Sequence, residues 1–203
     1  MTISKLKLKY SSLFLIPFIL MLGVFLCLGL TPFSKSSIHS GDFLSQYFPL
    51  YIGLHKMFWN GDFSGLFWSF EKSLGGAMPS VWGFNSLSPF TFLYVLFPIS
   101  SFHVISYIIP LIRFGVMGVV FGYFIEKKYQ AVSKRYWLAV GICTSYALSG
   151  FIISQHYNPN FLDNLVYVPF IFLGIEDIFH GKKSIKLPVF LALSLITNFY
   201  TGY

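Results

Sequence analysis

Acidic side chains are scarce in this chain, which has only seven aspartates and glutamates among its 203 residues. One of them is Asp42, in the stretch SGDFLSQY shortly after the first long apolar run. A carboxylate at a membrane surface can take a proton from a hydroxyl group that is presented there. The position also suits a helix N-cap, because Gly41 and Asp42 precede aromatic residues at helical spacing. The sequence leaves both roles open.

A second candidate is Arg113, which lies within the apolar run Val104–Ile125. A charge inside a membrane span is costly, so such an arginine either snorkels to the surface or pairs with an acid or a lipid phosphate. A guanidinium group can hold a phosphate through two parallel hydrogen bonds. Asp163, in the stretch PNFLDN, precedes a later apolar run. It either caps that helix, stays solvated in the loop, or faces the same external cavity as Asp42.

Metal and disulfide chemistry is not indicated by the sequence. Cys27 and Cys143 both lie inside apolar runs, where they fit as small core residues. The histidines lack the spacing of a metal-binding motif. They are His39, His55, His103, His156 and His180. We therefore expect no metal site built from these side chains.

The elements that must position these residues are membrane helices. The chain is 55% hydrophobic and only 10% charged, whereas a soluble domain usually carries about 25% charged residues. We expect an all-α integral membrane protein with about five hydrophobic segments. They are Ser12–Leu30, Val104–Ile125, Tyr136–Ile153, Leu165–Phe179 and a run that begins at Leu187. A further apolar stretch, Ser88–Pro98, is too short to span and fits a re-entrant segment or a packed half-helix.

The first segment is a retained signal anchor or a cleaved signal peptide. Leucines surround Cys27 where a cleavage site would need small residues, so we expect the segment to stay in place. A long polar and aromatic loop follows from Thr31 to Leu87. Within it, apolar residues recur at helical spacing and predict a helix in the membrane interface. They are Phe43, Tyr47, Leu50, Tyr51, Leu54 and Phe58.

Lysine and arginine residues indicate how the chain is oriented. Ten of them lie in three segments: the N-terminus, Glu126–Arg135 and His180–Lys186. If each of the first four segments crosses the membrane once, these three basic segments share one side, which is the cytoplasmic side. The loop at about 31–87 is then extracellular. The net charge of +7 is explained in this way and needs no nucleic-acid partner.

Four stretches in this order resemble the N-terminal part of the YfhO family of bacterial multi-spanning membrane proteins. They are GDFLSQYFPLYIGLHKMFWNGD, SLGGAMPSVWGFNSLSPFTFLYVLFP, NFLDNLVYVPFIFLGIE and LITNFYTGY. Members of that family are several times longer. The resemblance implies that residues 1–203 form the N-terminal part of a GT-C-like transmembrane domain. The abrupt end of the last apolar run also suggests a fragment.

The family is similar to GT-C glycosyltransferases, which use sugars on polyprenyl-phosphate carriers at the outer membrane face. The resemblance implies that Asp42 is the catalytic base or a ligand near the acceptor, and that the acceptor is an envelope polymer such as lipoteichoic or wall teichoic acid. Asp42 has no second acid beside it, which leaves the use of a divalent metal open. No other cofactor is implied. The predicted substrate-binding residues are Arg113, Tyr47, Asp163, Gln46 and His156.

The lipid bilayer, the lipid-linked sugar donor and the envelope polymer are thus the expected partners, and the bacterial cell membrane is the expected location. A transporter or lipid flippase is the main alternative, since Arg113 and the interfacial aromatic residues could serve translocation. No internal repeat supports it. A non-catalytic membrane protein is a further alternative. Exposed aromatic rings would stack on sugars or anchor the loop at the interface. The residues considered are Tyr47, Tyr51, Trp68 and Trp82.

Overall fold

The structure is a computed structural model that describes residues 3–34, 38, 41–70, 74–85 and 87–202. The described part is built mainly from helices, and its one strand pairing is a short hairpin. In that hairpin β1 (Trp68–Ser69) runs antiparallel to β2 (Gly76–Ala77), with Trp68 opposite Ala77.

Three stretches of the described chain are long and apolar enough to cross a membrane: Tyr10–Cys27, Ile99–Lys128 and Tyr136–Ser154. They correspond to α1 (Ile3–Cys27), to α5 (Phe102–Lys128) and to α7 (Tyr136–Ala147) followed by α8 (Gly150–Ser154). These helices confirm the predicted all-α membrane class. They also match the first three of the predicted segments.

The predicted segment Leu165–Phe179 forms the larger part of α9 (Pro159–Phe179). The helix starts earlier than the apolar pattern because Pro159 fits the first turn, where its missing N–H costs nothing. This earlier start brings Asp163 into the helix, so Asp163 is not a loop residue.

The last predicted segment is broken into α10 (Lys186–Thr197) and α11 (Phe199–Gly202). The break is at Asn198, which is fully buried. The side-chain amide of Asn164 in α9 donates a hydrogen bond to the backbone oxygen of Asn198 at 3.2 Å. A polar partner of this kind satisfies backbone groups that a broken helix leaves open in an apolar environment.

Glycines bring α1 and α5 into close contact. A Cβ atom on Gly118 would lie 2.3 Å from the backbone oxygen of Leu13, and one on Gly122 would lie 2.3 Å from Leu13 Cδ1. Small residues four apart on one helix face allow two membrane helices to approach in this way. The first span is therefore held directly against the helix that carries Arg113.

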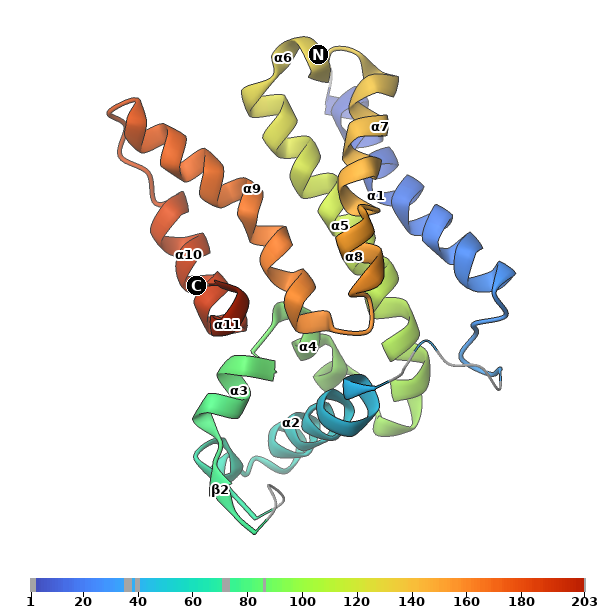
Figure 1. The fold of residues 1–203 in the computed structure, drawn as a ribbon, viewed down its shortest axis with the longest axis vertical. Coiled ribbons are helices and arrows are strands. Elements are labelled where there is room, and N and C mark those ends of the chain that lie inside the picture. The colour runs from blue at the N-terminus through green and yellow to red at the C-terminus, as the bar shows by residue number, and fades with distance from the viewer. Residues whose placement is uncertain (1–2, 35–37, 39–40, 71–73, 86, 203) are drawn as a thin grey trace.

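The two ends of the bundle differ in composition (Figure 1). The N-terminus, α6 (Gln130–Ser133) and the turn between α9 and α10 lie together at one end, which we call the basic end. The helices α2 and α3 and the hairpin lie at the other, which we call the loop end. The basic end thus gathers the three basic segments, and the loop end holds the long loop that the charge pattern assigned to the opposite side.

Ion pairs join the helices at the basic end. Lys128 of α5 pairs with Glu176 of α9, and Lys186 Nζ of α10 lies 2.6 Å from Asp177 Oδ2. The Tyr10 hydroxyl of α1 donates to Glu126 Oε2 at 2.7 Å. The acids of this end are thus used to connect four helices to one another.

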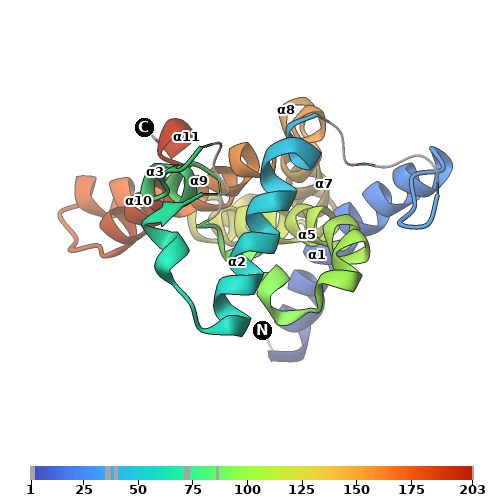
Figure 2. The ribbon, with the colours of Figure 1, turned by 90° about the horizontal axis from the view of Figure 1, so that it is seen from below.

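A helical rod lies across the loop end of the bundle, as the view from below shows (Figure 2). It begins with a π-helical turn, η1 (Phe43–Tyr47), and continues as α2 (Phe48–Asn60). The predicted apolar face is largely confirmed. Phe43, Tyr47, Tyr51 and Leu54 are buried, whereas Phe58 is 44% exposed. The buried face packs on rings of the bundle, with Tyr51 4.6 Å from Tyr94 between ring centroids.

Short elements complete the loop end: η2 (Ser64–Leu66), α3 (Pro79–Asn85), α4 (Pro89–Phe92), η3 (Leu93–Leu96) and η4 (Ile99–Ser101). The stretch Ser88–Pro98, predicted to be too short to span, forms α4 and η3 and buries Phe90 and Tyr94. A small core separate from the main one connects α2 to α3. It consists of Leu54, Met57, Met78 and Trp82.

Candidate functional site

Asp42 is exposed at the start of η1, on the loop end. It occupies the N-cap position, but its side chain makes no capping hydrogen bond. Its Oδ1 atom instead accepts a hydrogen bond from Gln46 Nε2, one helical turn later, at 3.1 Å. The capping role considered for this side chain is therefore not observed among the described residues, and the carboxylate is open to solvent beside the Gln46 amide.

The aromatic residues near Asp42 divide into buried and exposed rings. Tyr47 is 2% exposed, Tyr51 1% and Trp82 4%, whereas Trp68 is 53% exposed. Burial, followed by the nearby charge of Asp42, raises the pKa of Tyr47 to about 12. Tyr47 is therefore a neutral packing residue at ordinary pH. Of the four rings, Trp68 is the one that offers a wide exposed surface.

Arg113 pairs with Asp163. Arg113 Nε lies 2.7 Å from Asp163 Oδ1, and the two side chains are only 3% and 1% exposed. Within the described residues, Arg113 Nη1 has no hydrogen-bond partner. Of the alternatives for this arginine, the structure shows pairing with an acid, and snorkelling is wrong. Because Asp163 is buried, it does not share an external cavity with Asp42.

The pair is covered by the short helix α4 and by Ser88, the residue that precedes it. The guanidinium carbon of Arg113 lies 4.6 Å from the centre of the Phe90 ring, at the distance of a cation–π contact. The buried hydroxyl of Ser88 forms a side-chain hydrogen bond with Asp163. One ion pair thereby holds α4, α5 and α9 together at the loop end.

His156 lies beside this pair and is partly buried. Its Nδ1 atom is 2.8 Å from the backbone oxygen of Ile153. Together with Arg113 and Tyr51 it lines a cavity of about 10 Å³. A cavity of that size holds about one water molecule, so it cannot receive a sugar or a phosphate group in this arrangement.

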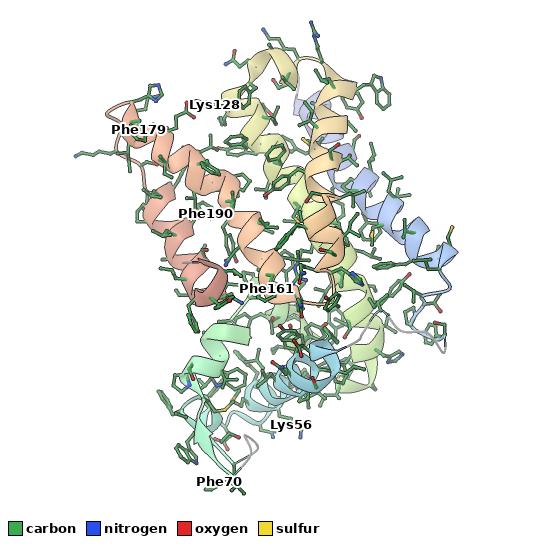
Figure 3. The ribbon with its side chains drawn as sticks, viewed as in Figure 1. Lys56, Phe70, Lys128, Phe161, Phe179 and Phe190 are labelled. Atoms are coloured by element: carbon green, nitrogen blue, oxygen red, sulfur yellow. The ribbon has the colours of Figure 1, made fainter. Side chains whose placement is uncertain are left out.

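A much larger groove lies on the other side of α2. It has a volume of about 710 Å³ and is lined by the polar face of η1 and α2 and by the segment from η2 to α3. Gln46, Lys56 and Asn60 contribute exposed polar side chains, and Trp68 contributes its ring. Figure 3 shows Phe70 at the extremity of the loop end and Lys56 on α2, both far from Lys128 and Phe179 at the basic end.

The predicted residues therefore fall into two places. Asp42 and Gln46 lie at the solvent-exposed start of the rod, whereas Arg113, Asp163 and His156 lie beneath it. Among the described residues, no group of three histidine, cysteine, aspartate or glutamate side chains could hold a metal ion.

Sequence reasoning missed the residues that build the two places. Ser88 and Phe90 were visible only as part of a short apolar stretch, although Ser88 before Pro89 is a helix-start signal. Lys56 and Asn60 stand four residues apart, a spacing that places them on one helix face. That spacing could have indicated a polar face opposite the aromatic one.

Comparison with known proteins identifies the family. A search of curated proteins and a search of solved structures gave no match. A family model described as "Bacterial membrane protein YfhO" matches residues 12–203. The match includes Asp42, Arg113, Asp163 and the groove. The apolar helices and this match together show that the chain belongs to the YfhO family of bacterial membrane proteins and sits in a lipid bilayer.

Proposed function

We propose that the chain is the N-terminal part of the transmembrane domain of a GT-C-type glycosyltransferase that acts on the outer face of the cell membrane. The donor is a sugar on polyprenyl phosphate, and the acceptor is an envelope polymer such as lipoteichoic or wall teichoic acid. Asp42 accepts the proton of an acceptor hydroxyl while that oxygen bonds to the anomeric carbon. The bond from this carbon to the phosphate oxygen breaks, and polyprenyl phosphate leaves.

One observation carries the proposal. The exposed Asp42 carboxylate lies at the loop end, opposite the three basic segments, and its partner Gln46 lines the large groove. With the basic end in the cytoplasm, Asp42 is extracytoplasmic and close to the ends of the membrane helices. A lipid-linked donor presents its sugar at that level. An acceptor in the groove would meet it there.

Arg113 and Asp163 have a positioning role in this proposal. Direct contact between Arg113 and the donor phosphate would require an exposed guanidinium group, and this one is 3% exposed. The ion pair and the Phe90 contact instead fix α4 against α5 and α9. Tyr94, in the short helix η3 that follows α4, supports the Tyr51 ring of the rod. The pair thereby supports the rod that carries Asp42.

The test is Asp42→Asn in the full-length protein. An amide cannot accept the proton, so transfer should fall by roughly 10²–10⁴-fold, the usual contribution of a positioned general base. Folding should be unaffected because the side chain is exposed and makes no capping bond. The readout is the sugar content of teichoic acid in complemented cells at matched membrane abundance.

A charge-matched control is available at the opposite end. Asp177→Asn also replaces an acid by its amide, but it removes a partly exposed ion pair with Lys186, and such pairs contribute little. It should leave transfer unchanged. Equal activity of Asp42→Asn and Asp177→Asn would exclude Asp42 as the base.

A transporter is the second candidate, and the buried Arg113–Asp163 pair favours it. Ionisable residues inside spans often mark transport paths. A transporter would move a lipid-linked sugar across the membrane without breaking its phosphate bond. Release of polyprenyl phosphate therefore separates the two functions.

A further inference from the structure

The hairpin at the loop end exposes aromatic rings where membrane anchoring does not explain them. Trp68 and Phe70, which both line the groove, are 53% and 79% exposed. Phe70 lies at the extremity of the molecule, beyond the rod and away from the membrane helices (Figure 3). Interfacial anchors lie level with the ends of the spans. Phe70 lies further out, so membrane anchoring does not explain its exposure.

The hairpin backbone holds Trp68 in a defined place. The rings of Trp68 and Phe70 meet edge to face, with their centroids 6.4 Å apart. Both rest on Gly75, where a Cβ atom would come within 3.2 Å of either ring. The φ angle of Gly75 is +108°, a conformation that glycine adopts readily and other residues avoid. Trp68 is thus supported on one side by the hairpin while it lines the groove.

Besides apolar residues such as Leu50 and Val81, the groove offers hydrogen-bonding groups with little net charge. Gln46 and Asn60 provide amides, and Ser45 provides a hydroxyl. The cation Lys56 is balanced by Asp62, whose carboxylate accepts the backbone N–H of Ser64 at 3.0 Å. The hydrogen bonds from Ser64 hold the pKa of Asp62 below its usual range. The volume of about 710 Å³ lies within the range of about 300–1,000 Å³ typical of ligand sites.

We propose that this groove binds a hydroxyl-rich acceptor chain, with the Trp68 ring stacked on one unit and with Gln46 and Asn60 bonded to hydroxyl groups. An aromatic face and a set of amides match a sugar or polyol, which has C–H faces and many hydroxyls. The inference rests on the proposed transferase function and names its acceptor subsite. Gln46 joins the subsite to the catalytic acid, because it lines the groove and donates to Asp42.

The experiment measures binding of purified lipoteichoic acid, stripped of its sugar substituents, to the full-length protein in lipid nanodiscs. Trp68→Ala should weaken binding roughly tenfold or more, as loss of a central aromatic contact does. Trp68→Phe, which keeps a ring, should recover most of the affinity.

Phe67→Ala is the matched control. Phe67 is more exposed than Trp68, is its neighbour in the chain, and does not line the groove. Its removal should leave binding unchanged. Equal losses of binding affinity in Phe67→Ala and Trp68→Ala would show non-specific attraction to the apolar hairpin and overturn the proposal. Unchanged affinity in Trp68→Ala would also overturn it.

Transfer assays on the same variants separate this inference from the proposed function. Trp68→Ala should raise the KM for the acceptor and leave the KM for the lipid-linked donor unchanged. Specific binding through Trp68 without any sugar transfer would retain the groove and reject the transferase. Sugar transfer that is indifferent to Trp68 would retain the transferase and reject the groove.

Discussion

At the scale of single residues, the Arg113–Asp163 pair shows how a buried ion pair affects stability. Both charges are almost fully buried, and a third contact, with Phe90, covers the guanidinium group. Removing water from the two charges costs several kcal/mol for each, and their mutual attraction stabilises the pair by a similar amount. The pair itself is therefore close to neutral in stability. Loss of only one partner is costly, because the remaining charge stays buried without compensation.

Arg113→Gln is thus expected to lower the free energy of unfolding by about 3–5 kcal/mol, as breaking a buried pair does. Asp163→Asn should have a similar effect. The double variant should recover most of the loss, since two amides can pair without a net charge. Unfolding of the full-length protein in mixed micelles measures all three. Additive losses in the double variant would show that the two side chains are not coupled.

The residue scale also shows the limits of sequence reasoning. The apolar run around Arg113 indicated that this residue needs a partner, yet Asp163 is distant in the chain and only the fold brings the two together. Tyr47 illustrates a second limit. Its spacing from Phe43 and Tyr51 correctly predicted that it lies on the apolar face of a helix. The spacing did not predict that this face is buried in the core. Periodicity locates a face and does not say what covers it.

At the scale of elements, contact between α1 and α5 depends on glycine. Gly118→Ala places a methyl group 2.3 Å from the Leu13 backbone oxygen, so the helices must separate. Overpacking of this kind costs about 1–3 kcal/mol. The control is Gly141→Ala in α7, where a Cβ atom would meet nothing within 4 Å and helix propensity slightly favours alanine. Thermal unfolding of both variants should show a loss for Gly118→Ala only.

Most elements could be predicted because apolar runs and helical spacing are local signals. The three spans and the rod across the loop end follow from such patterns. Two boundaries were missed. The helix α9 starts before its apolar pattern, at Pro159. The last segment breaks at Asn198, where the distant Asn164 supplies the hydrogen bond. The hairpin was not predicted, since strands of two residues carry no periodicity.

At the scale of the whole molecule, the separation of the basic end from the loop end predicts that the basic end lies in the cytoplasm and the loop end outside the cell. Cysteines introduced at the exposed positions Ser64 and Lys183, in a chain without Cys27 and Cys143, report the two ends. An impermeant thiol reagent should label Ser64→Cys in intact cells, and Lys183→Cys only after the cells are opened. The reverse pattern would place the N-terminus outside and remove Asp42 from the extracytoplasmic face.

The central claim is that Asp42 takes a proton during sugar transfer at the outer face. The most direct measurement follows a radiolabelled polyprenyl-phosphate sugar with the purified full-length protein in nanodiscs and teichoic acid as acceptor. The account predicts label on the polymer, equal release of polyprenyl phosphate, and a rate that is lower by roughly 10²-fold or more in Asp42→Asn. An unaltered rate in Asp42→Asn, or donor moved across the membrane with its phosphate bond intact, would contradict it.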